Sequence, residues 1–240
     1  MKKRLDKLVF EQGLTHSRHA ASELIQTGQI SVNGIIVTKN STQITPEAKI
    51  EIVGQTAKFV GRGGQKLAAA LKQFRISPKD LIVLDVGAST GGFTDCLLQN
   101  GAQKVYAVDV GSNQLVSQLK NDERVVSLEQ TDIRKIKKMP EEINFAVIDV
   151  SFISLELILP AVVNLINKQT KIIALVKPQF ETEKHAKNKS GVVNDQTKRE
   201  NSLEKIKKFC RNINLKIIAE MESPILGGSG NIEYFLLLEK

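Results

Sequence analysis

The sequence contains no tryptophan, only two cysteines, and few aromatic residues, which make up 5% of its 240 positions. Cys96 and Cys210 lie far apart, and their separation is typical neither of a disulfide framework nor of a metal site. No low-complexity tract is present, and the charged start lacks the apolar stretch of a signal peptide. These absences argue against a fibrous, disordered or disulfide-rich secreted protein. We expect reduced thiols, no bound metal and a cytoplasmic location.

Acidic residues are the minority among the charged ones. The chain has 34 Lys and Arg against 26 Asp and Glu, which gives a formal net charge of +8. Such an excess favours a polyanionic partner, with nucleic acid as the leading candidate. The length allows either one sizeable core or a small module joined to a larger domain.

One apolar run, residues 145–166, is long enough to cross a bilayer. Asp149, Glu156 and Pro160 interrupt it, and a carboxylate in mid-membrane costs at least about 2.5 kcal/mol. A buried strand followed by a core helix fits this pattern better. We therefore expect no membrane association.

Residues 1–60 form the first of two predicted domains. Apolar residues recur with helical spacing after Arg4 and after Ser17, and an alternating strand then leads to the pair Asn33-Gly34. This pair is typical of a two-residue hairpin turn, because both of its positions require a positive φ. Two helices followed by a hairpin predict a compact α+β unit with a small core.

The stretch "RLDKLVFEQGLTHSRHAASELIQTGQISVNG" resembles the RNA-binding domain first known from small-subunit ribosomal protein S-four. The resemblance implies an RNA-facing surface that is formed by Arg4, Lys7, Arg18, Asn33 and Lys39. Contacts from such residues to the RNA backbone would give affinity and salt dependence with little sequence choice. The alternative is a solvated basic face on a protein-interaction domain.

Residues 61–240 form the second predicted domain. A glycine cluster, Gly61, Gly63 and Gly64, precedes a helix, and apolar strands then alternate with helices. The strands are "LIVLDVG", "KVYAVDVG", "VVSLEQ", "FAVIDVS" and "KIIALVK". Near-continuous apolar strands between helices predict a parallel sheet that is covered on both faces. The last two strands, "LKIIAEMES" and "NIEYFLLLE", have no helix between them and predict an antiparallel hairpin at one sheet edge.

The segment "LDVGASTGGFT" sits at a strand-to-helix turn, where open α/β sheets bind ligands. Ser89 replaces the second glycine of the dinucleotide fingerprint, so a pyrophosphate would find a less accommodating turn than a carboxylate would. Asp109 ends the next strand, where its carboxylate can accept the hydroxyls of a ribose. Asp132 follows the third strand and could contact an adenine amine. This combination favours S-adenosylmethionine as the cofactor.

The predicted cofactor-binding residues are Asp85, Gly87, Ala88, Ser89, Thr90, Gly91, Gly92, Phe93, Asp109, Val110, Asp132 and Ile133. The fold class that follows is α/β, a class I (Rossmann-like) methyltransferase sheet, mostly parallel with a C-terminal antiparallel hairpin, plus the small N-terminal domain. Two alternatives remain open. The glycines could serve only packing with Asp109 as a cap, or the domain could be a nicotinamide-dependent dehydrogenase.

A lysine, Lys177, stands at the end of the apolar strand "KIIALV" and is followed by a proline. Asp149 ends the preceding strand in the same way. Carboxyl ends of neighbouring parallel strands face one crevice, so the two charges can meet there. Lys66, on the helix before the sheet, and Glu233, at the start of the last strand, are candidates to complete the group. A single pair of this kind is more often a structural salt bridge than a catalytic group.

The motifs "GRGGQKL", "DVGASTGGFTD", "VIDVSFISL", "LVKPQFE" and "SGNIEYF" resemble the TlyA (hemolysin A) family of rRNA ribose methyltransferases. The catalytic domain is similar to FtsJ-like 2′-O-methyltransferases with their Lys-Asp-Lys-Glu tetrad. The resemblance implies that Lys66, Asp149, Lys177 and Glu233 are catalytic. It also implies methyl transfer from S-adenosylmethionine to a cytidine 2′-hydroxyl in rRNA or a ribosomal subunit. The short termini resemble the members that act on large-subunit rRNA alone.

The sequence leaves open which role each tetrad residue has in catalysis. Lys177 can act as the general base for the ribose hydroxyl only in its neutral form. In the alternative, both lysines stay charged, orient the hydroxyl and stabilise developing negative charge on oxygen.

Further basic residues predict a second RNA-binding surface, comprising Arg62, Arg134, Lys184, Lys187 and Lys189. A solvated loop is the alternative for the three lysines. Two other functions remain open: a non-catalytic ribosome-assembly factor that binds RNA and cofactor, and a membrane-active hemolysin. We expect a monomer or a weak dimer.

Overall fold

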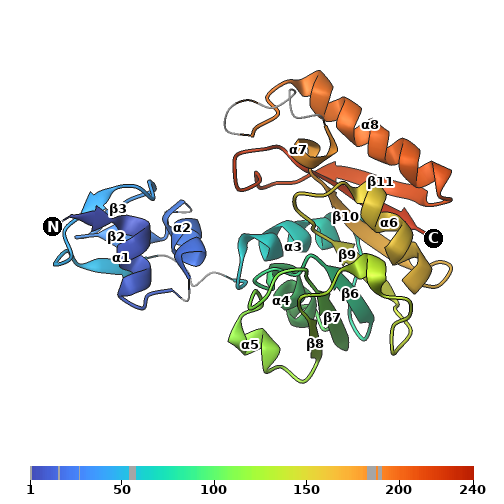
Figure 1. Ribbon diagram of the computed structural model, residues 1–240, viewed down its shortest axis with the longest axis horizontal. Coiled ribbons are helices and arrows are strands. Elements are labelled where there is room, and N and C mark those ends of the chain that lie inside the picture. Colours follow the sequence, from blue (N-terminus) through green and yellow to red (C-terminus); the bar gives the residue numbers. More distant parts are fainter. Residues whose placement is uncertain (1, 16, 27, 54–57, 183–187, 189–190) are drawn as a thin grey trace. The chain divides into compact units, whose positions relative to one another are not determined.

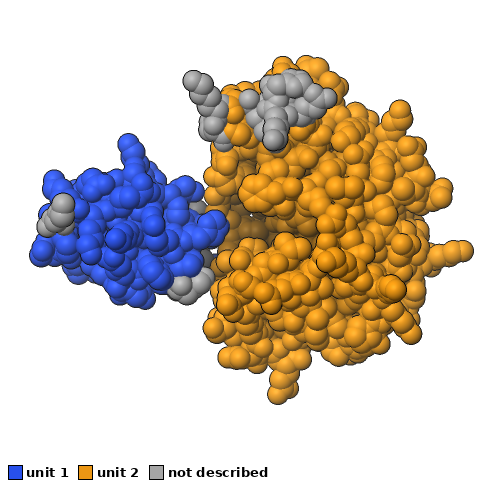
Figure 2. All heavy atoms as spheres, in the orientation of Figure 1, with its two compact units in different colours: residues 1–58 blue, residues 59–240 orange. Residues whose placement is uncertain are grey.

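The computed structural model describes residues 2–15, 17–26, 28–53, 58–182, 188 and 191–240. The chain divides into two compact units, residues 1–58 and residues 59–240 (Figure 2). Each unit has a hydrophobic core of its own. The two units are therefore considered one at a time.

Unit 1 consists of short elements around a small core. They are β1 (Lys3–Arg4), α1 (Leu5–Glu11), α2 (Arg18–Gln26), β2 (Ile30–Val32), β3 (Ile35–Ile36), β4 (Gln43–Ile44) and β5 (Ile50–Ile52). Leu5, Val9 and Ile25 are fully buried where the two helices and the sheet meet. The predicted hairpin is confirmed, because Asn33 and Gly34 have φ values of 50° and 80° between the antiparallel strands β2 and β3.

Unit 2 alternates strands and helices, as expected from the apolar runs. Its elements are α3 (Arg62–Phe74), β6 (Ile82–Val86), α4 (Gly92–Gln99), β7 (Lys104–Val108), α5 (Ser117–Lys120), β8 (Val125–Leu128), the 3-10 turn η1 (Ile133–Lys135), β9 (Phe145–Ile148), α6 (Leu155–Leu165), β10 (Lys171–Val176), α7 (Pro178–Glu181), α8 (Gln196–Asn212), β11 (Lys216–Glu222) and β12 (Tyr234–Glu239). Figure 1 shows these elements stacked as a central sheet between helices.

The sheet of unit 2 has the strand order β11-β12-β10-β9-β6-β7-β8. Strands β8, β7, β6, β9 and β10 are parallel, whereas β12 pairs antiparallel with both β10 and β11. The predicted parallel sheet with a C-terminal antiparallel hairpin is thus confirmed, with β12 inserted inside the sheet and β11 at its edge. The strand order reverses between β6 and β9, and ligands of open α/β sheets bind at such a switch point.

Each face of the sheet carries its own layer of helices (Figure 1). Strand residues such as Val83 and Val147 face α3 and α4, while their neighbours Leu84 and Ile148 face α6 and α8. This alternation follows from the period of two along a strand. Because both faces are covered, the strands are apolar on both sides, as the sequence pattern indicates.

The glycine cluster before α3 is placed differently from the prediction. The helix begins at Arg62, so Gly63 and Gly64 lie in its first turn and not ahead of it. A Cβ atom on Gly64 would lie 2.4 Å from Cβ of Phe59 and 2.8 Å from the carbonyl oxygen of Gly92. The glycines therefore allow the first turns of α3 and α4 to approach closely.

The long apolar run at 145–166 is divided between two elements. Residues 145–148 form β9, and α6 begins at Leu155 after a loop. Within the residues that the structure describes, no helix is long and apolar enough to cross a membrane.

Candidate active site

Two ion pairs, one buried and one partly buried, occupy the carboxyl edge of the unit 2 sheet. Lys177 Nζ lies 2.6 Å from Oδ1 of Asp149, and Lys66 Nζ lies 2.6 Å from Oε2 of Glu233. Lys66 is 7% exposed, Lys177 9% and Glu233 2%. The four residues that the sequence predicts as a tetrad are thus paired as two lysine-carboxylate contacts.

The topology of the sheet brings these four side chains to one edge. Asp149 and Lys177 directly follow the parallel neighbours β9 and β10. Glu233 directly precedes β12, whose first residue, Tyr234, pairs with Val176 at the end of β10. The antiparallel direction of β12 therefore places the start of that strand beside the ends of the others. Lys66 comes from α3, which covers this part of the sheet.

Further contacts surround each of the two ion pairs. Gln179 Nε2 donates a hydrogen bond to Glu233 Oε1 at 3.0 Å, and Lys177 Nζ donates to Ser151 Oγ at 2.9 Å. A Cβ placed on Gly63, in the first turn of α3, would lie 3.8 Å from Oδ2 of Asp149. The loops after β9 and β10, the start of β12 and the first turn of α3 therefore meet around one group of charges.

The burial of this group points to a function other than stability. Removing a lysine and a carboxylate from water costs several kcal/mol per ion, and their mutual attraction often does no more than offset that cost. Two such pairs at one sheet edge are therefore expected to add little to the free energy of unfolding. Titratable groups of this kind, gathered at the ligand-binding edge of an α/β sheet, are candidates for catalysis.

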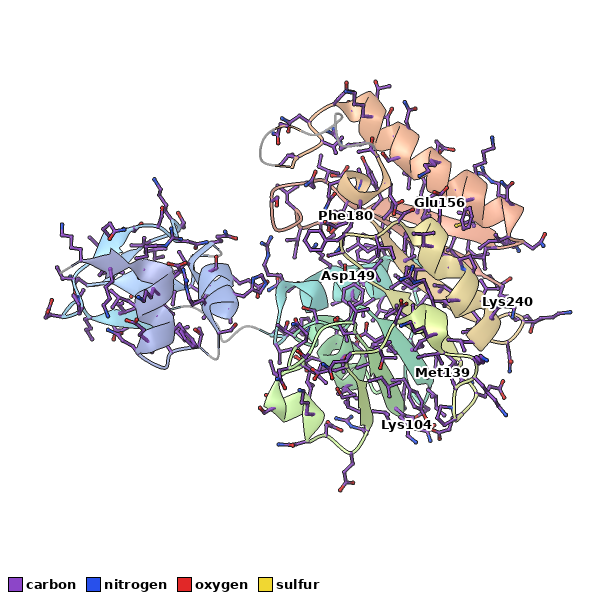
Figure 3. The ribbon with its side chains drawn as sticks, in the orientation of Figure 1. Lys104, Met139, Asp149, Glu156, Phe180 and Lys240 are labelled. Carbon is purple, nitrogen blue, oxygen red and sulfur yellow. The ribbon has the colours of Figure 1, made fainter. Side chains whose placement is uncertain are left out.

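Two aromatic rings stand next to the charges, and the sequence analysis did not single them out. The rings of Phe152 and Phe180 have centroids 5.1 Å apart, and Lys177 Nζ lies 5.9 Å from the centre of the Phe180 ring. Figure 3 labels Asp149 and Phe180 at this edge. Phe152 is 90% exposed and has a φ of 65°, which a bulky residue rarely adopts. An exposed aromatic side chain on a strained backbone is characteristic of a functional position.

Glu181 is a further residue that the sequence did not reveal as functional. Its carboxylate accepts hydrogen bonds from Ser154 Oγ and from the backbone N–H of Leu155. These two bonds connect α7 to the first turn of α6. Burial raises the pKa of Glu181 above its ordinary value. The motif "LVKPQFE" includes Glu181, but its sequence pattern indicated a function only for Lys177.

The glycine turn after β6 has the geometry of a ligand cradle. Gly87 and Gly91 have φ values of 87° and 101°, which side chains other than glycine rarely tolerate. Asp109 accepts hydrogen bonds at 2.8 Å from the backbone N–H groups of Ser89 and Gly111, one on each carboxylate oxygen. Asp109 thus organises the turn as a cap would, and each oxygen retains a lone pair for a further donor.

The other predicted cofactor residues surround this turn. Val110 is 73% exposed and offers an apolar surface, whereas Ala88, Phe93 and Ile133 are buried. Asp132 accepts hydrogen bonds from the backbone N–H and the guanidinium of Arg134, which hold its pKa at about 2. Contact of Asp132 with an adenine amine stays a prediction.

Asp85 lies beneath the turn and is fully buried. Thr94 Oγ1 donates a hydrogen bond to Oδ2 at 2.6 Å. Burial, together with the nearby carboxylates of Asp149 and Asp109, raises the pKa of Asp85 to about 7. Oδ1 of Asp85 has no hydrogen-bond partner among the residues that the structure describes.

The raised pKa of Asp85 predicts a measurable dependence of stability on pH. The folded state holds this proton up to about pH 7, whereas an unfolded Asp releases it near about pH 3.9. The contribution of Asp85 to the free energy of unfolding is therefore complete below the unfolded pKa and is lost as pH rises through the folded one. Between pH 5 and pH 8 we expect a loss on the order of 2 kcal/mol, which Asp85→Asn should remove. Urea unfolding of both proteins at the two pH values tests this, and equal pH dependence would contradict it.

In unit 1 the structure brings together two of the predicted RNA-binding residues. Arg4 Nε and an Nη of Arg18 lie 2.9 Å and 2.8 Å from opposite oxygens of Asp6. The Arg4 guanidinium is the main reason that the pKa of Asp6 falls to about 2. Both arginines are about half exposed, so each can also contact a phosphate.

The remaining predicted RNA-binding residues are dispersed. Lys7 lies 3.6 Å from Glu11, Asn33 accepts a hydrogen bond from the backbone N–H of Lys49 just before β5, and Lys39 is exposed. In unit 2, Arg62 donates to the carbonyl oxygen of Leu226 at 2.9 Å, and Arg134 pairs with Asp132. Lys184, Lys187 and Lys189 lie outside the described residues.

The strand order, the glycine turn after β6 and the acidic residue after β7 define the class of protein. This is the Rossmann-like fold of S-adenosylmethionine-dependent methyltransferases. A solved methyltransferase of that description from Mesorhizobium loti has a TM-score of 0.56, and the match covers 75% of this chain and 100% of that chain. At 11% identity, this likeness shows the fold alone.

The chain belongs to the FtsJ-like methyltransferase family, whose model matches residues 59–240, and an S4 domain matches residues 3–50. "Hemolysin A" of Brachyspira hyodysenteriae is 44% identical over 234 residues, 96% of this chain and 97% of that protein. The "16S/23S rRNA (cytidine-2'-O)-methyltransferase TlyA" of Mycobacterium tuberculosis is 39% identical over 238 residues, 98% and 89% of the two chains.

A solved structure, "Putative hemolysin from Streptococcus thermophilus", has a TM-score of 0.80 and 42% identity and covers 100% of this chain and 88% of that chain. Together these matches confirm the resemblance that the sequence motifs indicated. The protein is a methyltransferase by family, and the nicotinamide-dependent dehydrogenase is excluded.

Proposed function

We propose that this protein transfers a methyl group from S-adenosylmethionine to the ribose 2′-hydroxyl of a cytidine in ribosomal RNA. The observation that carries the proposal is the pairing of Lys177 with Asp149, and of Lys66 with Glu233, at the strand ends beside the glycine turn. This set of residues occupies the edge of the sheet where a methyltransferase fold binds its cofactor.

The residues around the turn fit S-adenosylmethionine. Asp109 retains acceptor capacity for ribose hydroxyls, and the exposed Val110 offers an apolar contact for the adenine ring. The glycine turn can receive the amino-acid part through its backbone. The Asp109 carboxylate beside the turn suits a ligand that carries an ammonium and a sulfonium. When bound, this cofactor supplies an electrophilic methyl group.

The chain's own residues then act on the acceptor hydroxyl. In this proposal Lys177 Nζ and the carboxylate of Asp149 hold the 2′-oxygen in line for attack, and the second ion pair, Lys66 with Glu233, completes the charged group. The 2′-hydroxyl would have to lose its proton as it reacts, and that proton would go either to a neutral Lys177 or to solvent. In the second case both lysines remain charged and stabilise the developing negative charge on oxygen.

RNA binding is proposed to use both units. The paired guanidiniums of Arg4 and Arg18 suit backbone phosphates, which give affinity without sequence choice. The exposed ring of Phe152 provides a face on which a base can stack next to the reacting ribose. The mycobacterial relative is named for both 16S and 23S rRNA, and for this chain we favour the large-subunit rRNA. An rRNA substrate also implies a cytoplasmic location.

Mass-spectrometric mapping of ribose methylation tests the proposal. Purified ribosomal subunits and free rRNA from cells that lack the protein are incubated with it and S-adenosylmethionine, and nucleotides that gain a methyl group are located. We expect 2′-O-methylcytidine in large-subunit rRNA. Cofactor binding without transfer to any ribosomal substrate would favour the assembly factor. Leakage from lipid vesicles without cofactor or RNA would favour the hemolysin.

A further inference from the structure

Glu129, directly after β8, gathers more donors than its position near the surface would suggest. Its carboxylate accepts hydrogen bonds from the backbone N–H groups of Asn113, Gln114 and Leu115 at 3.0, 2.7 and 2.8 Å. Lys120 Nζ donates to the same carboxylate at 2.9 Å. Three successive amides of one loop therefore share a single acceptor, whose pKa they and Lys120 lower to about 2. The carboxylate is charged throughout the ordinary pH range.

Other polar contacts on the loop that Glu129 holds, residues 110–116, are few. Gln130 donates its backbone N–H to the carbonyl oxygen of Gly111 at 2.8 Å, and Gln114 Nε2 donates to that of Ser112 at 3.5 Å. Ser112, Asn113 and Gln114 are exposed, and Asn113 has a φ of 52°. A positive φ at a residue other than glycine is unfavourable and persists only where neighbouring contacts impose it. In the absence of the carboxylate, the three amides would have to turn toward water. Among the described residues, Glu129 is therefore the side chain that accepts hydrogen bonds from the most backbone amides of this segment.

The same loop forms a wall against the glycine turn of the cofactor site. Val116 donates its backbone N–H to the carbonyl oxygen of Thr90 at 3.3 Å. A Cβ atom on Gly91 would lie 2.7 Å from a methyl of Leu115 and 2.2 Å from one of Leu119. The loop thus packs directly on the turn, and Leu119 of α5, which Figure 1 labels, lies against the residue that precedes α4.

A polar contact joins the loop to the turn at its other end. Asp109 receives the N–H of Gly111 on one oxygen and the N–H of Ser89 on the other. If the loop moved, Gly111 would move with it. The Asp109 carboxylate, which is proposed to bind the ribose, would then lose one of the two hydrogen bonds that orient it. Val110, the exposed apolar residue beside the turn, lies between Asp109 and Gly111.

We propose that Glu129 is a positioning residue for the cofactor: it holds the loop 110–116 so that Asp109 and Val110 face the ligand of the glycine turn. This inference rests on the proposed use of S-adenosylmethionine. Glu129 itself does not touch the methyl group or the RNA. Its effect should therefore appear in the affinity for S-adenosylmethionine and not in the rate of the saturated enzyme.

The test compares the full-length protein with Glu129→Gln and Glu129→Asp. The amide variant would turn an NH₂ group toward three donors, and the shorter carboxylate cannot reach all three amides. We expect the KM and the calorimetric Kd for S-adenosylmethionine to rise about tenfold or more in both variants. At saturating cofactor, kcat and the KM for rRNA should stay within about twofold of the wild-type values. Asp122→Asn is the matched control, because Asp122 pairs with Arg124 nearby and makes no contact with the loop.

The outcomes separate this inference from the proposed function. If the wild-type protein does not bind S-adenosylmethionine, the proposed function fails. If the wild type binds it and both Glu129 variants bind equally well, the role of Glu129 is overturned. A fall in kcat with an unchanged Kd would also overturn it. Amide hydrogen exchange at 113–115, faster in the variants than in the wild type, provides a readout that does not depend on cofactor.

Discussion

Replacing Lys177 by alanine is expected to lower kcat for methyl transfer by about 10²–10⁴-fold while leaving the affinity for S-adenosylmethionine largely unchanged. Lys177 lies 2.6 Å from Asp149 and donates to Ser151, but it makes no contact with the glycine turn in the described structure. Alanine leaves the half-buried Asp149 without its ammonium, so some loss of stability accompanies the loss of activity. Calorimetric titration with cofactor and single-turnover kinetics measure the two effects separately.

Two further variants sharpen this experiment. Lys171→Ala, at the exposed opposite end of the same strand β10, is the matched control and should retain full activity. Lys177→Arg keeps the positive charge but cannot act as a base. Activity well above that of the alanine variant would favour an electrostatic role, and activity equally low would favour proton abstraction. Wild-type turnover in Lys177→Ala would remove Lys177 from the catalytic set.

Replacing Gly227 by alanine is expected to lower kcat by about 10²-fold, although no functional atom is removed. A Cβ atom at this position would lie 2.4 Å from Oε1 of Glu233 and 3.0 Å from its Cδ. The Glu233 side chain has little room to shift, because it is 2% exposed. It also accepts hydrogen bonds from Lys66 at 2.6 Å and from Gln179 at 3.0 Å. The added methyl should therefore displace the carboxylate and loosen Lys66.

The neighbouring glycine provides a close control. A Cβ atom on Gly228 would meet no atom within 4 Å, so Gly228→Ala should leave kcat unchanged and alter the free energy of unfolding by no more than about 0.5 kcal/mol. Gly227→Ala should also cost about 1–3 kcal/mol of stability through overpacking. Steady-state kinetics and urea unfolding of both variants give the comparison. Equal activities in the two variants would show that the position of Glu233 is unimportant.

Much of the fold could be predicted because each strand carries its own local pattern. The near-continuous apolar strands indicated burial on both faces, and Asn33-Gly34 indicated a hairpin. Asp149 and Lys177 could be placed together for the same reason, because the ends of parallel strands share one edge. The predicted start of α3 was wrong, because glycines such as Gly63 and Gly64 usually indicate the end of a helix. Here they lie inside the helix and leave room for Phe59 and the first turn of α4.

The missed residues depend on contacts between segments that are distant in sequence. Glu181 reaches the first turn of α6, and Glu129 reaches a loop that follows another strand. Nothing in the local sequence around either carboxylate distinguishes it from a solvated one. The exposure of Phe152 and its positive φ likewise follow from the loop between β9 and α6 and not from its neighbours in sequence. A pattern reveals which residues can face inward, but not which backbone amides they meet.

The insertion of β12 beside β10 has a consequence for biosynthesis. Lys66 and its partner Glu233 are separated by 167 positions, so their contact forms only after nearly all of unit 2 has been translated. Without β12, Lys66 would lack its carboxylate partner, and burying an unpaired ammonium is costly. Strand β12 is therefore the strand of unit 2 that completes the proposed reaction centre, because the two ion pairs cannot both form before it is in place.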